Sequence, residues 1–356
     1  MFKAEELFQN ITDKNHPDET VLTIIQGKGT LPREQAGRNI HYDDASLSNY
    51  KKVEQGDFII HLRSFEGGLE MANEAGIVSP AYTILRCKRP HSSLFYDAYF
   101  HTDEFINHNL SKSVEGIRDG RQISYEAFKW LGIPYCEPTE QEKISNLFAA
   151  LNERIAKQRD LIEALKKYKR GAVAHILSSK SVAFAVTSSW TEHTLSELCS
   201  EFRSGRNISA TLIHQTGNFP VYGGNGIRGY CNQYSHDGEY VVVGRQGALC
   251  GNVRLIQGKN YLSEHAIAVQ ANEANETKFL LYLLDYMKLG QYSDQGAQPG
   301  LAVNRLLRLK CMVPDKQTQI KIASFLMSFD FQISTQERML MLLNCQRRAL
   351  LQQLFI

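Results

Sequence analysis

The sequence lacks the features that mark secreted, membrane-spanning and metal-binding proteins. Its seven cysteines are odd in number and scattered, without a C-x-x-C pair, so neither a disulfide framework nor a zinc knuckle is expected. No apolar run approaches the roughly 20 residues of a transmembrane helix, and residues 1–6 turn acidic at once instead of forming a leader. The eleven histidines do not cluster at ligand spacing. These absences predict a soluble, cytoplasmic protein with reduced thiols and no metal.

The motifs of common catalytic sites are absent as well. The chain has no Walker G-x-x-x-x-G-K-[ST], no H-E-x-x-H, no G-x-S-x-G and no Asn-Pro-Pro-Tyr or Asp-Pro-Pro-Tyr. The segment from Gly224 to Gly229 satisfies G-x-G-x-x-G, but residues 230–238 after it have the composition of a loop, whereas dinucleotide binding needs a helix there. We therefore expect no catalytic residue and no cofactor.

Charge of one sign is not in excess either. Lys and Arg number 40 against 38 Asp and Glu. Residues 1–136 carry 15 basic and 19 acidic side chains, residues 137–180 carry 9 and 6, residues 190–313 carry 11 and 10, and residues 314–356 carry 5 and 3. A protein that grips nucleic acid alone usually has a basic footprint. If DNA is the partner, binding must come from local patches or from another, basic subunit.

What the sequence does contain is a repeat. Gly116 and Gly120 recur 180 residues later as Gly296 and Gly300, and after a slip of two residues the match resumes along 143–177 and 321–355. Upstream, residues 56–60 (GDFII) parallel residues 238–242 (GEYVV). One such pair could arise by chance, but a collinear series over most of the chain indicates a duplicated domain.

Two long segments have the apolar spacing of amphipathic helices, with steps of three and four residues over 139–177 and 314–355. Each would be about 55–60 Å long at 1.5 Å per residue, too long to be buried in a small domain. We predict that they pack against each other as an antiparallel coiled coil; the alternative is that each packs on its own domain. The residues predicted at the helix–helix seam are Ile144, Leu147, Leu151, Ile155, Leu165, Ile322, Phe325, Phe329, Ile333 and Leu343.

The predicted fold class is therefore α+β: two globular units of mixed structure in tandem repeat with pseudo-twofold symmetry, separated by the two long helices. The predicted boundaries are a first unit at 1–136, a helix at 137–178, a linker at 179–189, a second unit at 190–313 and a helix at 314–356.

Glycine-rich loops that carry arginine, glutamine, asparagine and tyrosine are the candidates for contacts with DNA. Arginine offers a two-pronged donor to guanine and glutamine can bind adenine in the major groove. Plain surface turns and salt-bridged arginines are the alternatives, and the basic run 166–170 fits a solvated helix end better than a nucleic-acid patch. The candidate DNA-binding residues are Lys28, Arg33, Arg38, Arg63, Ser64, Arg118, Arg121, Arg206, Tyr222, Asn225, Arg228, Tyr230, Arg245, Gln246 and Gln298.

The order of unit, helix, unit, helix resembles the specificity (S) subunit of type I restriction-modification systems over nearly the whole chain. The strings that carry the resemblance are GIVSPAY at 76–82, GDF at 56–58, PVYGGNGIRGY at 220–230, GRQGALCGN at 244–252 and the Gln141, Lys143, Ile144 pattern at the first helix. The start of the second helix, residues 317–322, departs from the usual pattern of the family.

This resemblance implies a non-catalytic subunit with two target-recognition domains, each reading one half of a split double-stranded DNA sequence. The helices would set the gap between the halves and dock two methyltransferase subunits, and motor-nuclease subunits would join in the full complex. S-adenosylmethionine, ATP and magnesium would be bound by those partners. The alternatives are a stand-alone bivalent DNA-binding or scaffolding protein and, without residues to support it, an enzyme.

Overall fold

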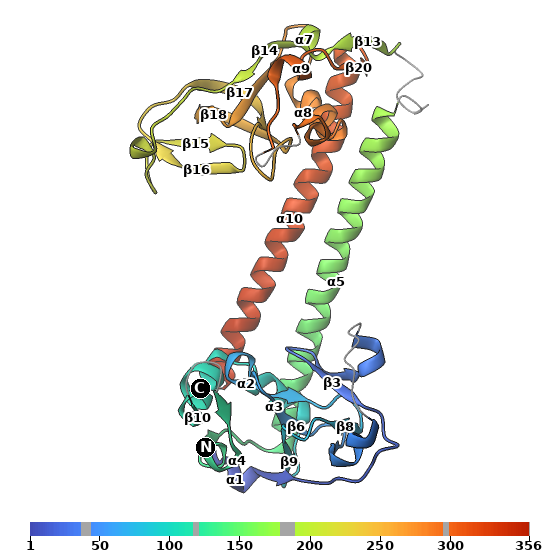
Figure 1. Cartoon of the computed structure of the whole chain (residues 1–356), viewed down its shortest axis with the longest axis vertical. Coiled ribbons are helices and arrows are strands. Elements are labelled where there is room, and N and C mark those ends of the chain that lie inside the picture. Colours follow the sequence, from blue (N-terminus) through green and yellow to red (C-terminus); the bar gives the residue numbers. More distant parts are fainter. Residues whose placement is uncertain (37–43, 117–120, 179–188, 295–298, 356) are drawn as a thin grey trace. The chain divides into compact units, whose positions relative to one another are not determined.

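A computed structural model describes residues 1–36, 44–116, 121–178, 189–294 and 299–355 (Figure 1). Its contacts divide the chain into two units, Met1–Arg159 with Arg338–Ile356, and Asp160–Glu337. We call them unit 1 and unit 2. Each unit holds one globular region and a segment of each long helix. Most of the predicted linker, residues 179–188, lies outside the described residues.

The two long helices are α5 (Pro138–Leu177) and α10 (Lys316–Leu354), close to the predicted ranges. In unit 2, Lys166 pairs with Glu337 at 2.8 Å and Lys169 pairs with Asp330 at 2.6 Å. Since the residue number rises along one helix as it falls along the other, the helices are antiparallel. The predicted fold class, mixed α+β with two long helices packed together, is confirmed.

The predicted seam residues lie in three kinds of surroundings. Leu151, Ile155 and Leu343 form a buried cluster between the helices in unit 1, and the Phe329 ring lies 5.3 Å from the Tyr168 ring in unit 2. Leu165 is half-buried and Ile333 is buried. Ile144 and Ile322 instead pack against the cores of their own globular regions. Leu147 and Phe325 are 45% and 40% exposed, outside these buried clusters.

Unit 1 contains a four-stranded antiparallel sheet in the order β2 (Phe8–Ile11), β9 (Thr83–Cys87), β6 (Phe58–Ile60), β7 (Glu70–Met71). Aromatic side chains from this sheet and from helix α3 (Ser93–Phe100) fill the core. The remaining elements of the region are β3 (Leu22–Ile25), β4 (Gly29–Pro32), β5 (Lys51–Val53), α2 (Ser64–Gly67), β8 (Gly76–Val78), β10 (Val114–Glu115), β11 (Gln122–Ile123) and α4 (Tyr125–Phe128).

Unit 2 contains a six-stranded sheet in the order β14, β19, β17, β18, β15, β16. All its neighbours are antiparallel except β15 and β18, which are parallel. The bounds are β14 (Cys199–Ser204), β15 (Phe219–Gly223), β16 (Gly226–Cys231), β17 (His236–Gly244), β18 (Val253–Leu262), β19 (Ala266–Ala271), α8 (Thr277–Tyr286) and α9 (Val303–Leu306).

The same order of elements occurs in both units. In unit 1, β1 (Phe2–Lys3) pairs with β12 (Gly132–Ile133) just before α5, and α1 (Ala4–Leu7) follows β1. In unit 2, β13 (Thr191–Thr194) pairs with β20 (Lys310–Val313) just before α10, and α7 (Leu195–Leu198) follows β13. The sheet order β2-β9-β6-β7 has its counterpart in β14-β19-β17-β18. The predicted tandem repeat is thus visible in the topology.

Each core is completed by the end of the helix that begins in the other half of the chain. Leu351 and Phe355, at the end of α10, are buried in the core of unit 1. Ile176 and Leu177, at the end of α5, are buried in the core of unit 2. The helices are therefore part of both hydrophobic cores.

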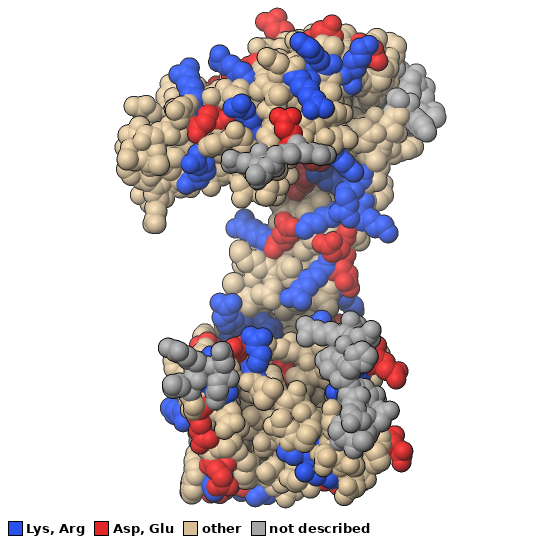
Figure 2. Space-filling view, viewed as in Figure 1, with Lys and Arg blue, Asp and Glu red and all other residues tan. Residues whose placement is uncertain are grey.

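Charged side chains of both signs are intermixed on the face shown in Figure 2, in agreement with the balanced composition. No helix among the described residues is long and apolar enough to cross a bilayer.

A buried glutamine joins the start of each long helix to the helix that covers the sheet. In unit 1, Gln141 accepts a hydrogen bond from the Ser92 N–H at 2.9 Å and donates to the Cys136 carbonyl at 2.7 Å. Its side chain has no exposed surface. Ser92 is the residue before α3, so the glutamine ties α3 to α5.

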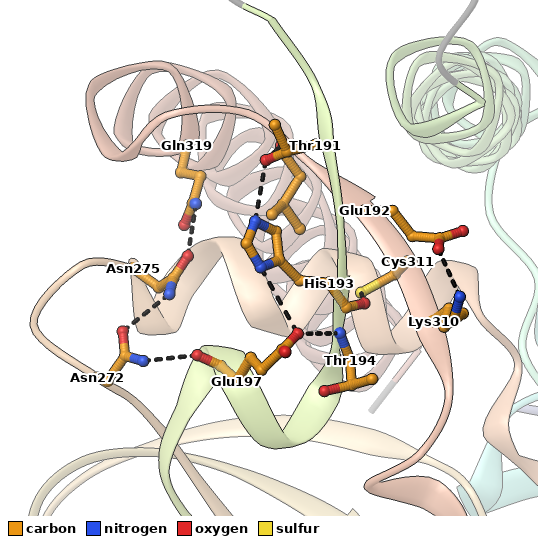
Figure 3. A network of polar contacts seen from close by, with 11 residues as sticks. Thr191, Glu192, His193, Thr194, Glu197, Asn272, Asn275, Lys310, Cys311 and Gln319 are labelled. Atoms are coloured by element: carbon orange, nitrogen blue, oxygen red, sulfur yellow. Dashed lines mark hydrogen bonds and ion pairs between the residues drawn. The ribbon is translucent and has the colours of Figure 1, made fainter.

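Gln319 makes the matching bonds in unit 2. It accepts from the Glu276 N–H at 3.0 Å, and it donates to the Pro314 carbonyl at 2.9 Å and to Asn275 at 2.8 Å. Figure 3 shows Asn275 continuing through Asn272 to the Glu197 carbonyl of α7. We call these two arrangements the glutamine latches.

Candidate nucleic-acid interface

One end of the unit 2 sheet gathers the loops that carry most candidate residues. The Arg206 N–H donates to the Leu262 carbonyl at 2.8 Å, and the Ser263 N–H donates to the Tyr222 carbonyl at 2.9 Å. The Arg245 N–H donates to the His265 carbonyl at 2.9 Å. We call this region, residues 205–206, 222–226, 244–252 and 262–265, the loop end of unit 2.

Glycines allow these loops to approach one another. A Cβ on Gly224 would lie 2.4 Å from the Gln246 carbonyl oxygen, and a Cβ on Gly244 would lie 2.4 Å from the Gly224 carbonyl oxygen. Both distances are shorter than van der Waals contact, so any larger residue would separate the loops. The glycine-rich string therefore serves loop packing, and no helix follows it that would bind a dinucleotide.

Two arginine side chains lie against bare glycines of the β15–β16 hairpin. A Cβ on Gly223 would meet Arg228 Cδ at 2.5 Å, and one on Gly226 would meet Arg254 Nη1 at 2.7 Å. Arg254 also lines a cavity of about 190 Å³ with Tyr222 and Asn225 among its other walls. Sequence reasoning missed Arg254 because it lies inside a strand, where no motif marks it.

Arg245 has a different environment. Its Nη1 donates to the Glu264 carbonyl at 3.2 Å and its Nε to the Leu301 carbonyl at 3.5 Å. These bonds use the guanidinium to join loops. The backbone of Tyr230 pairs with His214 through two 2.8 Å hydrogen bonds, on the edge strand β16.

In unit 1, Lys28 lies at the exposed tip of the β3–β4 hairpin. The buried carboxylate of Glu70 holds this tip, because it accepts from the Gly27 N–H at 2.6 Å and from the Gly29 N–H at 2.9 Å. Arg33 lies 5.9 Å from the Tyr50 ring.

The other unit 1 candidates are dispersed. Arg63 pairs with Glu66, with its Nε at 2.8 Å, and Arg121 lies 4.2 Å over the Phe65 ring. Ser64 is fully buried and its Oγ accepts from the His61 N–H at 2.9 Å. A side chain without exposed surface is out of reach of DNA, so Ser64 is corrected to a structural residue of the loop. Arg38, Arg118 and Gln298 lie outside the described residues.

Comparison with known proteins agrees with the geometry. Residues 187–341 match the family model of the type I restriction modification DNA specificity domain. The specificity subunit of the type I restriction enzyme EcoprrI from Escherichia coli is 45% identical over 141 residues, which is 38% of this chain and 35% of that relative. The chain belongs to the type I specificity-subunit family. The match spans about a third of the length of this relative.

The fold of this family member is similar to solved specificity subunits over its whole length. The S subunit of a type I restriction-modification system from M. genitalium has a TM-score of 0.66 at 18% identity, covering 100% of this chain and 95% of that one. The HsdS subunit from Thermoanaerobacter tengcongensis has a TM-score of 0.52 at 16% identity, covering 99% and 95%. At these identities the likeness supports the fold.

The described residues contain no cluster of three potential metal ligands. The buried polar groups of this specificity-subunit relative instead hold its loops, and Glu70 with His101 is the clearest case, at 3.3 Å. Burial opposes the charge on both side chains. The hydrogen bond between them outweighs burial, so the pKa of His101 is raised and the pKa of Glu70 is lowered.

These shifts predict a pH dependence of unit 1. The His101 contribution is fully present below the unfolded-state pKa of about 6.5 and is lost as the pH rises through the raised folded pKa. The Glu70 contribution is present above its unfolded-state pKa and is lost in acid. Urea unfolding of unit 1, followed by Trp130 fluorescence, should therefore show falling stability from about pH 6.5 upward. His101→Gln should remove this fall, and His16→Gln, on the same unit, should keep it. An unchanged slope in His101→Gln would refute the assignment.

Proposed function

We propose that this chain is the DNA-specificity subunit of a type I restriction-modification complex, and that each globular unit reads one half of a bipartite double-stranded DNA target. The observation that carries the proposal is the repeat of one topology with different loops. Equal scaffolds with unlike loop ends suit two different half-sites, as in dimeric DNA binders whose half-site spacing follows from protein geometry. The balanced charge favours action within a complex over tight binding by the lone chain.

The loop end of unit 2 offers the chemistry for one half-site. Arg206, Asn225, Arg228 and Arg254 are exposed there. Arginine and asparagine bind base edges in the major groove, and arginine also binds phosphates. Arg245 belongs to the same loops, where it has the positioning role described above.

Unit 1 would contact its half-site through a more dispersed set. Lys28 at the hairpin tip and Arg121 are exposed. Arg33 and Arg63 complete the described candidates of this unit. Lysine supplies a point charge suited to phosphate, which positions the protein without reading sequence.

The long helices would set the gap between half-sites and dock two methyltransferase subunits, with motor-nuclease subunits added for restriction. Exposed apolar side chains support a docking role, because large exposed hydrophobic groups mark interaction surfaces. Phe331 on α10 is 74% exposed and Tyr168 on α5 is also exposed. The chemistry of methyl transfer and ATP hydrolysis, with S-adenosylmethionine, ATP and magnesium, would reside in those partners, so this chain would be no enzyme itself.

A unit exchange tests the proposal. Residues 190–313 are replaced by the second unit of a divergent relative, and the chimera is expressed with the methyltransferase subunits in a host without their methylation. Methylation mapping should show one half of the recognised sequence changed and the other half and the gap retained. A change in both halves, or in neither, would contradict the modular assignment.

A docking variant tests the helix surface. Phe331→Asp should reduce recovery of the methyltransferase subunits by at least about tenfold, because a buried aromatic anchor typically contributes 2 kcal/mol or more. Leu62→Asp, at an exposed apolar position of unit 1, is the control and should leave recovery unchanged. Sequence-specific DNA binding by the lone chain without any partner would favour the stand-alone alternative.

A further inference from the structure

A chain of hydrogen bonds runs through the loop end of unit 2. Glu264 Oε1 lies 2.9 Å from His265 Nε2, and His265 Nδ1 lies 2.5 Å from Gln246 Oε1. A carboxylate oxygen and an amide oxygen are both acceptors, so in this arrangement the imidazole donates an N–H to each. Gln246 therefore uses its acceptor inside the protein, and its amide nitrogen keeps its donors.

The backbone around Gln246 is held from two sides. Gln246 forms an antiparallel bridge with Gly300, flanked by hydrogen bonds from the Gly247 N–H to the Pro299 carbonyl at 3.0 Å and from the Leu301 N–H to the Arg245 carbonyl at 2.9 Å. On the other side the Arg245 N–H bonds to the His265 carbonyl. With main chain and side chain both fixed, little conformational entropy remains to be lost on binding.

Fixing the amide in one orientation has a chemical consequence. A free glutamine reads adenine through two bonds, one of which needs the amide oxygen as acceptor for the adenine N6 amino group. A glutamine whose oxygen is already bound offers donors only. Guanine presents two acceptors in the major groove, N7 and O6, so it is the base that suits a donor.

We propose that the Glu264–His265 pair holds Gln246 as a hydrogen-bond donor that selects guanine over adenine at one position of the half-site read by unit 2. The inference rests on the proposed function and deepens it. His265 is then a positioning residue and Gln246 the specificity-determining one. Unit 1 has no counterpart, since the repeat places buried Ser64 where unit 2 has Gln246, so the effect is confined to one half-site.

The test compares His265→Leu, Gln246→Glu and the wild-type chain, each co-expressed with the methyltransferase subunits in a host without their methylation. Sites methylated across a genome are mapped and the base ratio is counted at every position. His265→Leu frees the amide oxygen, so the guanine-to-adenine ratio should fall about tenfold at one position. Gln246→Glu presents acceptors only and should shift that position toward cytosine, whose N4 amino group donates.

The control is Gln257→Glu, which makes the same change on the exposed part of β18 and should leave every ratio unchanged. Unaltered ratios in both test variants, with methylation retained, overturn the inference and leave the proposed function standing. Absence of bipartite methylation by the wild-type chain would overturn the proposed function itself. If His265→Leu does not fold, Gln246→Ala replaces it, and it must lose the base preference at the same single position.

Discussion

Phe355→Ala should lower the free energy of unfolding of unit 1 by about 3–5 kcal/mol, the usual range for removing a buried phenylalanine ring. Its ring lies 5.0 Å from that of Phe95, 5.5 Å from that of Tyr99 and 6.2 Å from that of Phe148. The second-last residue of the chain thus fills the core of the unit that the first residues begin. Removal of the ring leaves a cavity among three aromatic neighbours, and rigid aromatic packing collapses poorly into such a space.

The two tryptophans make this effect measurable unit by unit, since Trp130 lies in unit 1 and Trp190 in unit 2. In a Trp190→Phe background, fluorescence reports unit 1, and the Phe355→Ala transition should move to lower urea concentration. Leu354→Ala is the control on the neighbouring residue, which is 40% exposed and should change stability by less than about 1 kcal/mol. Equal destabilisation by both variants would show that the chain end frays and that Phe355 does not complete the core.

The long helices could be predicted from the sequence because their signal is local and repeated. An apolar stripe over some forty residues averages out individual exceptions, and the observed bounds Pro138–Leu177 and Lys316–Leu354 fall close to those expected. The same stripe does not say which partner each residue meets. Ile144 and Ile322 sit on the stripe, yet the first turns of the helices lie on globular cores, so these side chains pack there.

The candidate interface was less predictable, because the role of a loop residue depends on neighbours that are distant in sequence. Arg63 and Arg245 occupy matching positions, but Arg63 pairs with Glu66 whereas Arg245 bonds to loop carbonyls. His265, expected as a lone polar contact, connects Glu264 to Gln246. No spacing rule relates these residues, since their proximity follows from the pairing of β17 with β19.

The glutamine latches lay within reach of sequence analysis, because the offset of 178 residues that relates the two helices also pairs Gln141 with Gln319. A polar residue repeated on the apolar stripe of both helices indicates a shared partner. What the repeat could not reveal was that each amide bonds to backbone groups on both sides, which determines how strongly it stabilises its unit.

Gln319→Ala should therefore destabilise unit 2 by about 2–4 kcal/mol, because it leaves the buried Glu276 N–H and Pro314 carbonyl without their partner, at roughly 1–3 kcal/mol for each such group. Gln141→Ala should do the same to unit 1 through the Ser92 N–H and the Cys136 carbonyl. Each variant should shift the urea transition of its own unit alone, reported by Trp190 for unit 2 and by Trp130 for unit 1.

The control is Gln317→Ala, two residues earlier on α10, where the side chain is exposed and its loss should be nearly neutral. Gln319→Glu retains the acceptor for the Glu276 N–H but loses both donors, so its stability should lie between wild type and Gln319→Ala near neutral pH only if burial of the carboxylate is tolerated. Since Gln319 is 1% exposed, the cost of burying that charge should exceed the bond retained, and Gln319→Glu should be the less stable of the two variants. A glutamate variant as stable as wild type would mean that the amide donors contribute nothing and that the latch holds through Oε1 alone.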